Sequence, residues 1–208
     1  SDTGLSIDAD TGAVTLAADP DYETQSDYSF TVVATDAAGN VSEGQAVALS
    51  VNDLDEVAPT VTSADTATAI DENSGADQVI YTATADDSSD ISAGISFSLA
   101  EGSDTGLSID ADTGAVTLAA DPDHETQSDY SFTVVATDAA GNANAGQIVT
   151  LSVNDLDEIS PTVTSANTAT AIDENSGADQ VIYTATADDS ADISAGISFS
   201  LAEGSDTG

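Results

Sequence analysis

The chain alternates short hydrophobic stretches with clusters of glycine, aspartate and asparagine. Apolar and polar residues alternate over residues 28–35, where Tyr28, Phe30 and Val32 fall on one face, and again over residues 47–51. A period of two is typical of half-buried β-strands, and no stretch sustains the 3.6-residue period of a helix. Further strands are predicted at residues 60–62, 79–81, 95–99, 107–109 and 115–118.

This pattern occurs twice along the chain. Residues 1–106 align without a gap with residues 103–208, with a period of 102 and ten differences. Such a period is too long for a solenoid unit and corresponds to a small domain. Seven strands in about 100 residues are typical of a Greek-key sandwich. We therefore expect an all-β fold, a tandem array of Greek-key β-sandwiches with seven strands per repeat.

Acidic runs that end in proline mark the predicted domain boundaries. Residues 53–59 (DLDEVAP) follow the last predicted strand, and residues 155–161 (DLDEISP) repeat them. Proline favours extended backbone before it, so we place the joints here. The prediction is that residues 1–56 are the C-terminal half of one repeat, 57–157 a complete repeat and 158–208 the N-terminal half of the next. The chain opens in mid-repeat without the basic and apolar regions of a signal peptide, so we expect a window on a longer protein.

Composition narrows the classes of function. The chain has 39 Asp and Glu residues, one His and no Lys or Arg, which gives a formal net charge of −39. Nucleic acids and anionic lipids both need a basic surface, so we expect no nucleic-acid partner and no membrane contact by this segment. The absence of cysteine excludes disulfides, zinc-thiolate sites and thiol nucleophiles. The predominance of aspartate, a short-armed oxygen ligand, favours hard divalent cations as the missing positive charge.

Acidic phrases recur at four places in each repeat: DEN at 71–73, DPDHE at 121–125, ATD at 34–36 and again at 136–138, and the joint itself. Calcium takes six to eight oxygen ligands, so carboxylates from two domains and their linker would have to converge on it. Together with the phrases ISFSL, LSIDADTGAVTLAADPDHE, YSFTVVATDAAGN and VNDLDEVAP, they make the chain resemble cadherin and bacterial cadherin-like repeats over the whole period. In that family, calcium ions fill and stiffen each joint between domains.

The resemblance implies several calcium ions per joint and a set of carboxylate ligands. By phrase, these are Glu72 and Glu174; Asp21, Glu23, Asp123 and Glu125; Asp53, Asp55, Glu56, Asp155, Asp157 and Glu158; and Asp36 and Asp138. The family's D-x-D phrase is matched only imperfectly, so Asp86, Asp87 or Asp90 could serve in one repeat and Asp188, Asp189 or Asp192 in the next. The linker also departs from the family's D-x-N-D-N, because Asp, Glu and Val or Ile replace its last three residues.

Other interpretations would give these residues roles other than calcium binding. The acidic residues could be turn and cap residues on a merely acidic surface. Residues 110–114 (DADTG) suggest an EF-hand loop, but Ala115 stands where that loop needs glycine and a strand follows, so a hairpin turn is favoured. His124 as a general base is disfavoured because its twin is Tyr22. An acidic pair at 86–87 could mimic a glycosidase dyad, but the chain has no tryptophan to stack on a sugar. We therefore expect no enzyme.

Two functions of different classes fit these expectations. One is a structural extender, a calcium-stiffened stalk of a bacterial surface adhesin of the RTX type or an extracellular fibre, which projects a distal binding region from the cell. Its partners would be neighbouring repeats, head-to-tail in a linear fibre, and weak self-association through calcium is also allowed. The other is an adhesive module that binds homophilically or binds carbohydrate. The near-identity of the repeats favours the extender, because variation clusters only at residues 41–43 and 143–145.

Overall fold

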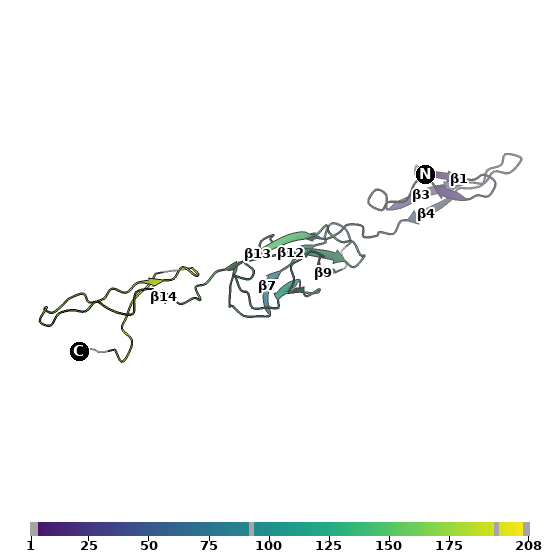
Figure 1. Cartoon of the computed structure of the whole chain (residues 1–208). Coiled ribbons are helices and arrows are strands. Elements are labelled where there is room, and N and C mark those ends of the chain that lie inside the picture. The colour runs from purple at the N-terminus through teal and green to yellow at the C-terminus, as the bar shows by residue number, and fades with distance from the viewer. Residues whose placement is uncertain (1–3, 92–93, 194–195, 206–208) are drawn as a thin grey trace.

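The chain forms a succession of three segments along one direction (Figure 1). A computed structural model describes residues 4–91, 94–193 and 196–205. Every regular element in these residues is a β-strand, which confirms the predicted all-β class. The described part of the chain contains no helix long and apolar enough to cross a membrane.

The strands divide unequally among the three segments. The N-terminal segment contains β1 (Leu5–Ile7), β2 (Val14–Leu16), β3 (Asp27–Val32) and β4 (Gln45–Ser50). The central segment contains β5 (Thr60–Val61), β6 (Ile70–Asp71), β7 (Gln78–Thr82), β8 (Ala85–Asp86), β9 (Ile95–Leu99), β10 (Leu107–Ile109), β11 (Ala115–Leu118), β12 (Asp129–Asp138) and β13 (Gln147–Asn154). The C-terminal segment contains β14 (Thr162–Val163) and β15 (Ala187–Asp188).

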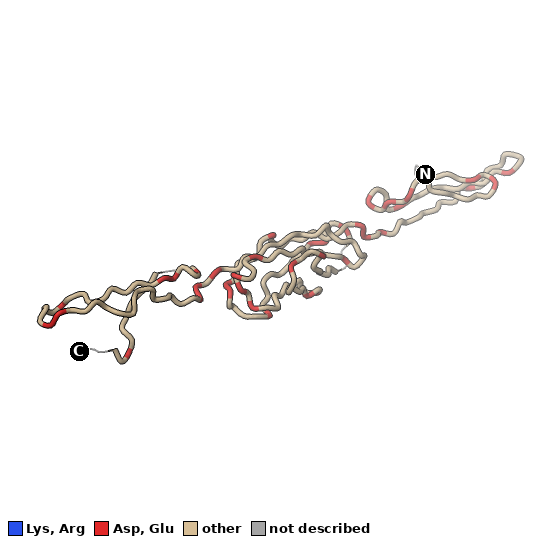
Figure 2. The backbone as a smooth tube through the Cα atoms, viewed as in Figure 1, with Lys and Arg blue, Asp and Glu red and all other residues tan. Residues whose placement is uncertain are grey.

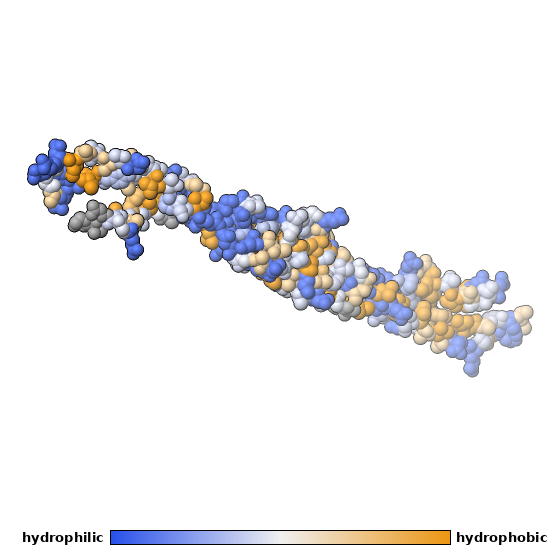
Figure 3. Space-filling view, turned by 60° about the horizontal axis from the view of Figure 1, so that its bottom comes forward, coloured by the Kyte–Doolittle hydropathy of each residue, from blue (hydrophilic) through white to orange (hydrophobic). Residues whose placement is uncertain are grey.

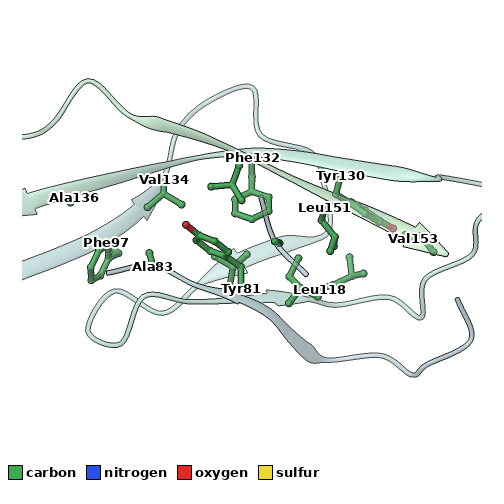
Figure 4. Close-up of a cluster of buried hydrophobic side chains, with 14 residues drawn as sticks. Tyr81, Ala83, Phe97, Leu118, Tyr130, Phe132, Val134, Ala136, Leu151 and Val153 are labelled. Atoms are coloured by element: carbon green, nitrogen blue, oxygen red, sulfur yellow. The ribbon is translucent and has the colours of Figure 1, made fainter. Parts of the chain in front are cut away.

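The central segment is a β-sandwich of two main sheets, and β5 and β8 form a separate two-stranded sheet. One sheet has the strand order β10-β11-β7, and the other has the order β6-β13-β12-β9. All neighbours are antiparallel except β13 and β6, which run parallel. Hydrophobic side chains from both sheets meet between them and form one core (Figure 4).

Strand β12 shows how the two-residue period builds this core. Its buried positions are Tyr130, Phe132, Val134 and Ala136, and each intervening side chain is more exposed. The Phe132 ring packs edge-on against Tyr81 of the facing sheet, with 5.6 Å between centroids and 70° between planes. The same period carries Asp138, the last residue of the strand, onto the core-facing side, where only 5% of its surface is exposed. A carboxylate is thus buried at one end of the sandwich.

The hairpin between β10 and β11 confirms the predicted turn at residues 110–114. Oδ1 of Asp110 accepts hydrogen bonds from the backbone N–H of Thr113 and from its hydroxyl, each at 2.8 Å. These two hydrogen bonds from Thr113 are the main cause of the lowered pKa of Asp110. Gly114 has φ 70°, and a Cβ there would lie 2.5 Å from the Ala83 carbonyl oxygen. Glycine is required at this turn for both conformation and space.

Every strand predicted for the central segment is present. The short strands β6 and β8 were not predicted, because two residues are too few to show alternation. They exist through partners distant in sequence: β6 pairs with β13 and β8 pairs with β5.

The two end segments expose several residues whose equivalents the central segment buries, although Tyr28 is buried like its equivalent Tyr130. Phe97 is 9% exposed in β9, whereas its equivalent Phe199 is 55% exposed. Leu151 is fully buried in β13, whereas its equivalent Leu49 in β4 is 42% exposed. Hydrophobic side chains accordingly lie at the surface of both end segments (Figure 3).

A substitution in the core tests the packing of the sandwich. We expect Phe132→Ala to lower the free energy of unfolding by about 3–5 kcal/mol, because it removes a buried ring from both sheets' shared core. Ser131→Ala on the exposed face of the same strand is the matched control and should change it by less than about 0.5 kcal/mol. Denaturant unfolding followed by circular dichroism measures both. Equal losses in the two variants would contradict this packing.

Candidate metal centre

Acidic residues gather where the segments meet. Figure 2 shows Asp and Glu along the narrow stretches that connect the central segment to its neighbours. We call residues 53–58 with the side chains around them the first joint, and residues 155–160 with theirs the second joint. Since the two linkers are 102 residues apart, equivalent positions in the joints can be compared directly.

One carboxylate cluster in the first joint combines Asp55 of the linker with Asp87 and Asp138 of the central sandwich. A carboxylate oxygen from each lies within 4.8 Å of the others. Asp87 is 7% exposed and Asp138 is 5% exposed. Asp87 directly follows β8 and Asp138 ends β12, so the ends of two strands aim their carboxylates at the linker.

Asp138 accepts more of the hydrogen bonds in this cluster than Asp55 or Asp87. Asp138 Oδ1 accepts from the backbone N–H of Gly141 at 2.7 Å and of Asn142 at 2.8 Å, and the Asn142 amide donates to Oδ2 at 2.9 Å. Burial raises the pKa of Asp138, but these bonds outweigh it and the pKa is lowered. The same Asn142 amide donates to the Asp55 carbonyl at 2.9 Å, which ties the linker to the sandwich.

The linker carboxylate of this cluster, Asp55, differs from Asp138 in the direction of its pKa shift. Desolvation, followed by repulsion from Asp138 and Asp87, raises the pKa of Asp55. Within the described residues, Oδ2 of Asp55 and Oδ2 of Asp87 are buried and accept no hydrogen bond. A buried charge without a partner is costly, so these two oxygens require a cation or a proton.

A second cluster in the first joint joins the segments on either side of the linker. It contains Glu23 of the N-terminal segment, Asp53 of the linker and Asp90 of the central segment. The Glu23 backbone N–H lowers the pKa of its own side chain, but burial and repulsion from Glu56, Asp53 and Asp90 outweigh this, and the pKa is raised. Oδ1 of Asp53 is another buried oxygen that accepts no hydrogen bond from the described residues.

The second joint brings Glu72, Asp123 and Glu125 together. Glu72 is 1% exposed, and its carboxylate accepts from the backbone N–H of His124 at 2.8 Å and from that of Leu156. The Glu72 side chain thereby links the sandwich to residues 121–125, which precede β12, and to the linker. Asp155 joins Glu125 and His124 in an adjoining cluster, and its buried Oδ1 accepts no hydrogen bond from any described residue.

The chemistry of these ligands fits a hard divalent cation. All ligands of the first joint are carboxylate oxygens, and the chain has no Lys or Arg to neutralise them. Ligands on opposite sides of a calcium ion are about 4.6–5.2 Å apart, given bonds of about 2.3–2.6 Å, and separations within 4.8 Å suit such a shell. The unpartnered oxygens are therefore in position to bind one.

The structure brings together about half of the residues predicted as ligands. Those in the clusters are Glu23, Asp53, Asp55, Glu72, Asp87, Asp123, Glu125, Asp138 and Asp155. Asp90, an alternative to Asp86 and Asp87, also lies in a cluster, whereas Asp86 lies in β8 and accepts from the Ser88 hydroxyl.

The remaining predicted ligands lie outside the clusters found among the described residues. Asp21 and Asp36 accept local turn hydrogen bonds, from Thr24 and Asn40. Glu56 and Glu158 lie in the linkers, and their backbone N–H groups donate to Asp90 and Asp192, the latter at 3.0 Å. Asp157 is also in a linker, and Glu174, Asp188 and Asp189 belong to the C-terminal segment. Sequence reasoning did not consider His124 as a ligand, although it stands inside an acidic phrase.

Comparison with known proteins agrees with this fold. Residues 66–154 match the Cadherin domain family. The chain is 31% identical over 175 residues to human Protocadherin Fat 1, covering 82% of this chain and 4% of that protein. It is 29% identical over 204 residues to Cadherin-20 of Xenopus laevis, covering 92% of this chain and 26% of that protein. The chain thus spans only a small part of these cadherin relatives.

Solved cadherin structures share the architecture. Mouse Cadherin-23 EC22-24 superposes with a TM-score of 0.56 at 22% identity, covering 88% of this chain and 60% of that one. The Protocadherin GammaB4 extracellular domain superposes with a TM-score of 0.55 at 21% identity, covering 80% and 29%. The fold is therefore a cadherin-like β-sandwich, as predicted from the sequence.

The effect of neutralising an unpartnered carboxylate on the stability of the protein should depend on whether calcium is present. Asp87→Asn removes a buried charge while keeping the shape of the side chain. In chelator we expect the free energy of unfolding to rise by about 1–3 kcal/mol, because repulsion with Asp55 and Asp138 is relieved. In millimolar calcium chloride we expect the variant to be stabilised less than the wild type, because a charged ligand is missing.

Thermal unfolding with and without calcium measures both effects. Asp86→Asn is the matched control, since this neighbouring side chain is exposed and lies in no cluster found among the described residues. It should unfold like the wild type in both buffers. A loss of stability by Asp87→Asn in chelator would show that its charge is already compensated within the protein.

Proposed function

We propose that this chain is a calcium-stiffened extender repeat of a bacterial extracellular adhesin or fibre, which projects a distal binding region from the cell surface. The observation that carries the proposal is the set of buried, unpartnered carboxylate oxygens at both joints. Similarity to extracellular cadherin structures supports an extracellular, non-enzymatic role. Near-identical repeats and the resemblance to bacterial cadherin-like repeats support the bacterial fibre.

Calcium would be held by residues from both sides of each linker. In the first joint, Asp55, Asp87 and Asp138 would bind one ion, and Glu23, Asp53 and Asp90 would bind another. The ion supplies positive charge and bridges the carboxylates. Because Glu23 precedes the linker and Asp90 follows it, binding would restrict the angle between the two segments.

The second joint contains the sequence equivalents of the second of these clusters. Glu125, Asp155 and Asp192 are the equivalents of Glu23, Asp53 and Asp90. There, the buried Glu72 adds a ligand whose carboxylate already receives backbone donors from both sides of the site. Glu72 would orient the linker, and the proposed ion would complete the shell.

The domain division follows from the same joints. We propose that residues 57–157 are a complete repeat, and that 1–56 and 158–208 are complementary halves. Some exposed apolar residues of 158–208, such as Phe199, are equivalents of one part of the central core, and some of those of 1–56, such as Leu49, are equivalents of another part. A neighbouring repeat, in the same or another chain, would complete each half and extend a linear head-to-tail fibre.

Calcium removal tests the stiffening. We expect chelation to broaden the distribution of dimensions and shorten the average end-to-end distance, because the empty carboxylates repel one another and release the linkers. Millimolar calcium should reverse this, since extracellular modules bind with a Kd of roughly 10⁻⁴–10⁻³ M. Small-angle scattering, with sodium chloride at matched ionic strength as control, measures the change. An unchanged maximum dimension and melting temperature would contradict the proposal.

Association of the 208-residue chain tests the complementary halves. Phe199→Ser should weaken concentration-dependent head-to-tail association about 10–100-fold, because the ring would enter a core as its equivalent Phe97 does. Val181→Ser is the control: Val181 is exposed, and so is its equivalent Val79 in the complete sandwich. Sedimentation equilibrium in calcium measures both variants. Equal weakening by the two would exclude this mode of assembly.

A further inference from the structure

The second joint contains a nitrogen ligand that the first joint lacks. His124 is the chain's one histidine, and the equivalent residue in the first repeat is Tyr22. In the second joint, His124 forms a cluster with Glu125 and Asp155 in which one ligand atom of each lies within 4.8 Å of the others. The corresponding cluster in the first joint, Glu23 with Asp53 and Asp90, contains carboxylates alone.

The imidazole is aimed at both carboxylates. Nδ1 of His124 lies 3.5 Å from Oε1 of Glu125 and 3.5 Å from Oδ2 of Asp155. Its backbone is held in place, because the His124 N–H donates at 2.8 Å to the buried Glu72 carboxylate. Two-thirds or more of the side-chain surfaces of His124 and Asp155 are covered.

A second observation points to a cation at this place. The other carboxylate oxygen of Asp155, Oδ1, is buried and accepts no hydrogen bond from the described residues. One oxygen of this side chain therefore faces the imidazole while the other lacks a partner. An ion pair of histidine with Oδ2 would leave Oδ1 uncompensated, whereas a cation bound by both oxygens of Asp155 would not.

The separations suit a small first-row cation. Bonds of about 2.0–2.2 Å to nitrogen and oxygen in a tetrahedral site place neighbouring ligand atoms about 3.4 Å apart, close to the two 3.5 Å separations. Calcium and magnesium prefer oxygen alone, whereas imidazole with carboxylates suits zinc, cobalt(II) and nickel(II). The nitrogen therefore decides the class of metal.

We propose that His124, Glu125 and Asp155 form a site for a borderline divalent cation such as zinc, present at the second joint and absent from the first. Glu125 and Asp155 are also proposed calcium ligands, so the two metals would compete for the joint. The proposal does not depend on calcium binding, because the nitrogen ligand acts on zinc whether or not calcium binds there. Repeats of nearly identical sequence would then have joints with different metal preferences.

The test compares the full chain with His124→Tyr, which gives the second repeat the residue of the first. At pH 7.5, where an ordinary imidazole is mostly neutral, zinc is titrated calorimetrically into calcium-free protein. Loss of an outer-shell partner alone costs roughly 10–100-fold in metal affinity, so loss of this ligand should weaken the tightest zinc site at least about tenfold. Calcium affinity, measured separately, should change less than about twofold.

Two further measurements distinguish ligation from a supporting role. His124→Gln keeps a polar side chain without the imidazole nitrogen and should lose zinc affinity as His124→Tyr does. Cobalt(II) should shift the ring-proton resonances of the one histidine strongly in the wild type. Equal zinc affinity in all three proteins, or an unshifted histidine spectrum with bound cobalt, would overturn the proposal and leave a simple ion pair. So would a parallel loss of zinc and calcium affinity in both variants, which would mean that His124 only maintains the shape of the joint.

Discussion

Repulsion between carboxylates that are partly removed from water is the constraint on which the joints depend. The chain carries 39 acidic residues and no Lys or Arg, and the linkers bring several carboxylates within 4.8 Å of one another. The raised pKa values of Asp55, Glu23 and Glu125 all reflect burial and neighbouring negative charge, although a backbone N–H donor opposes the rise at each of them. Burying such charges without a compensating cation or proton is costly.

The sandwich core provides the rigidity that keeps these carboxylates converged. Asp138 continues the buried face of β12 beyond Ala136, and Asp87 directly follows β8, so neither can retreat into solvent without disturbing a strand. Backbone donors then select which oxygens are satisfied. Asp138 receives several, which lower its pKa, whereas Asp87 retains a buried oxygen without a partner among the described residues. Packing and hydrogen bonding together hold these carboxylates close to one another, although not all of their oxygens have a partner among the described residues.

The negative charge that lies away from the joints affects how copies of the chain interact with one another. Residues 1–102 contain 15 Asp and 5 Glu, a formal charge of −20 per repeat. Even three divalent ions at a joint would leave about −14, which salt screens over a Debye length of about 8 Å at 0.15 M. A surface of one sign repels other copies of itself, whereas the end segments expose apolar side chains such as Phe199 and Leu49.

The amino-acid sequence alone determined the all-β class, the 102-residue period, the turn at Asp110 and the acidic phrases of the joints, because alternation, spacing and turn chemistry are local. Tertiary structure decided the rest. The sequence left Asp86, Asp87 and Asp90 as alternatives, and only the path of the chain after β8 places Asp87 in one cluster and Asp90 in another. Strands β6 and β8 exist through distant partners, and the unpartnered oxygen of Asp155 depends on the fold around it. Burial and convergence belong to residues far apart in the chain, and no local pattern records them.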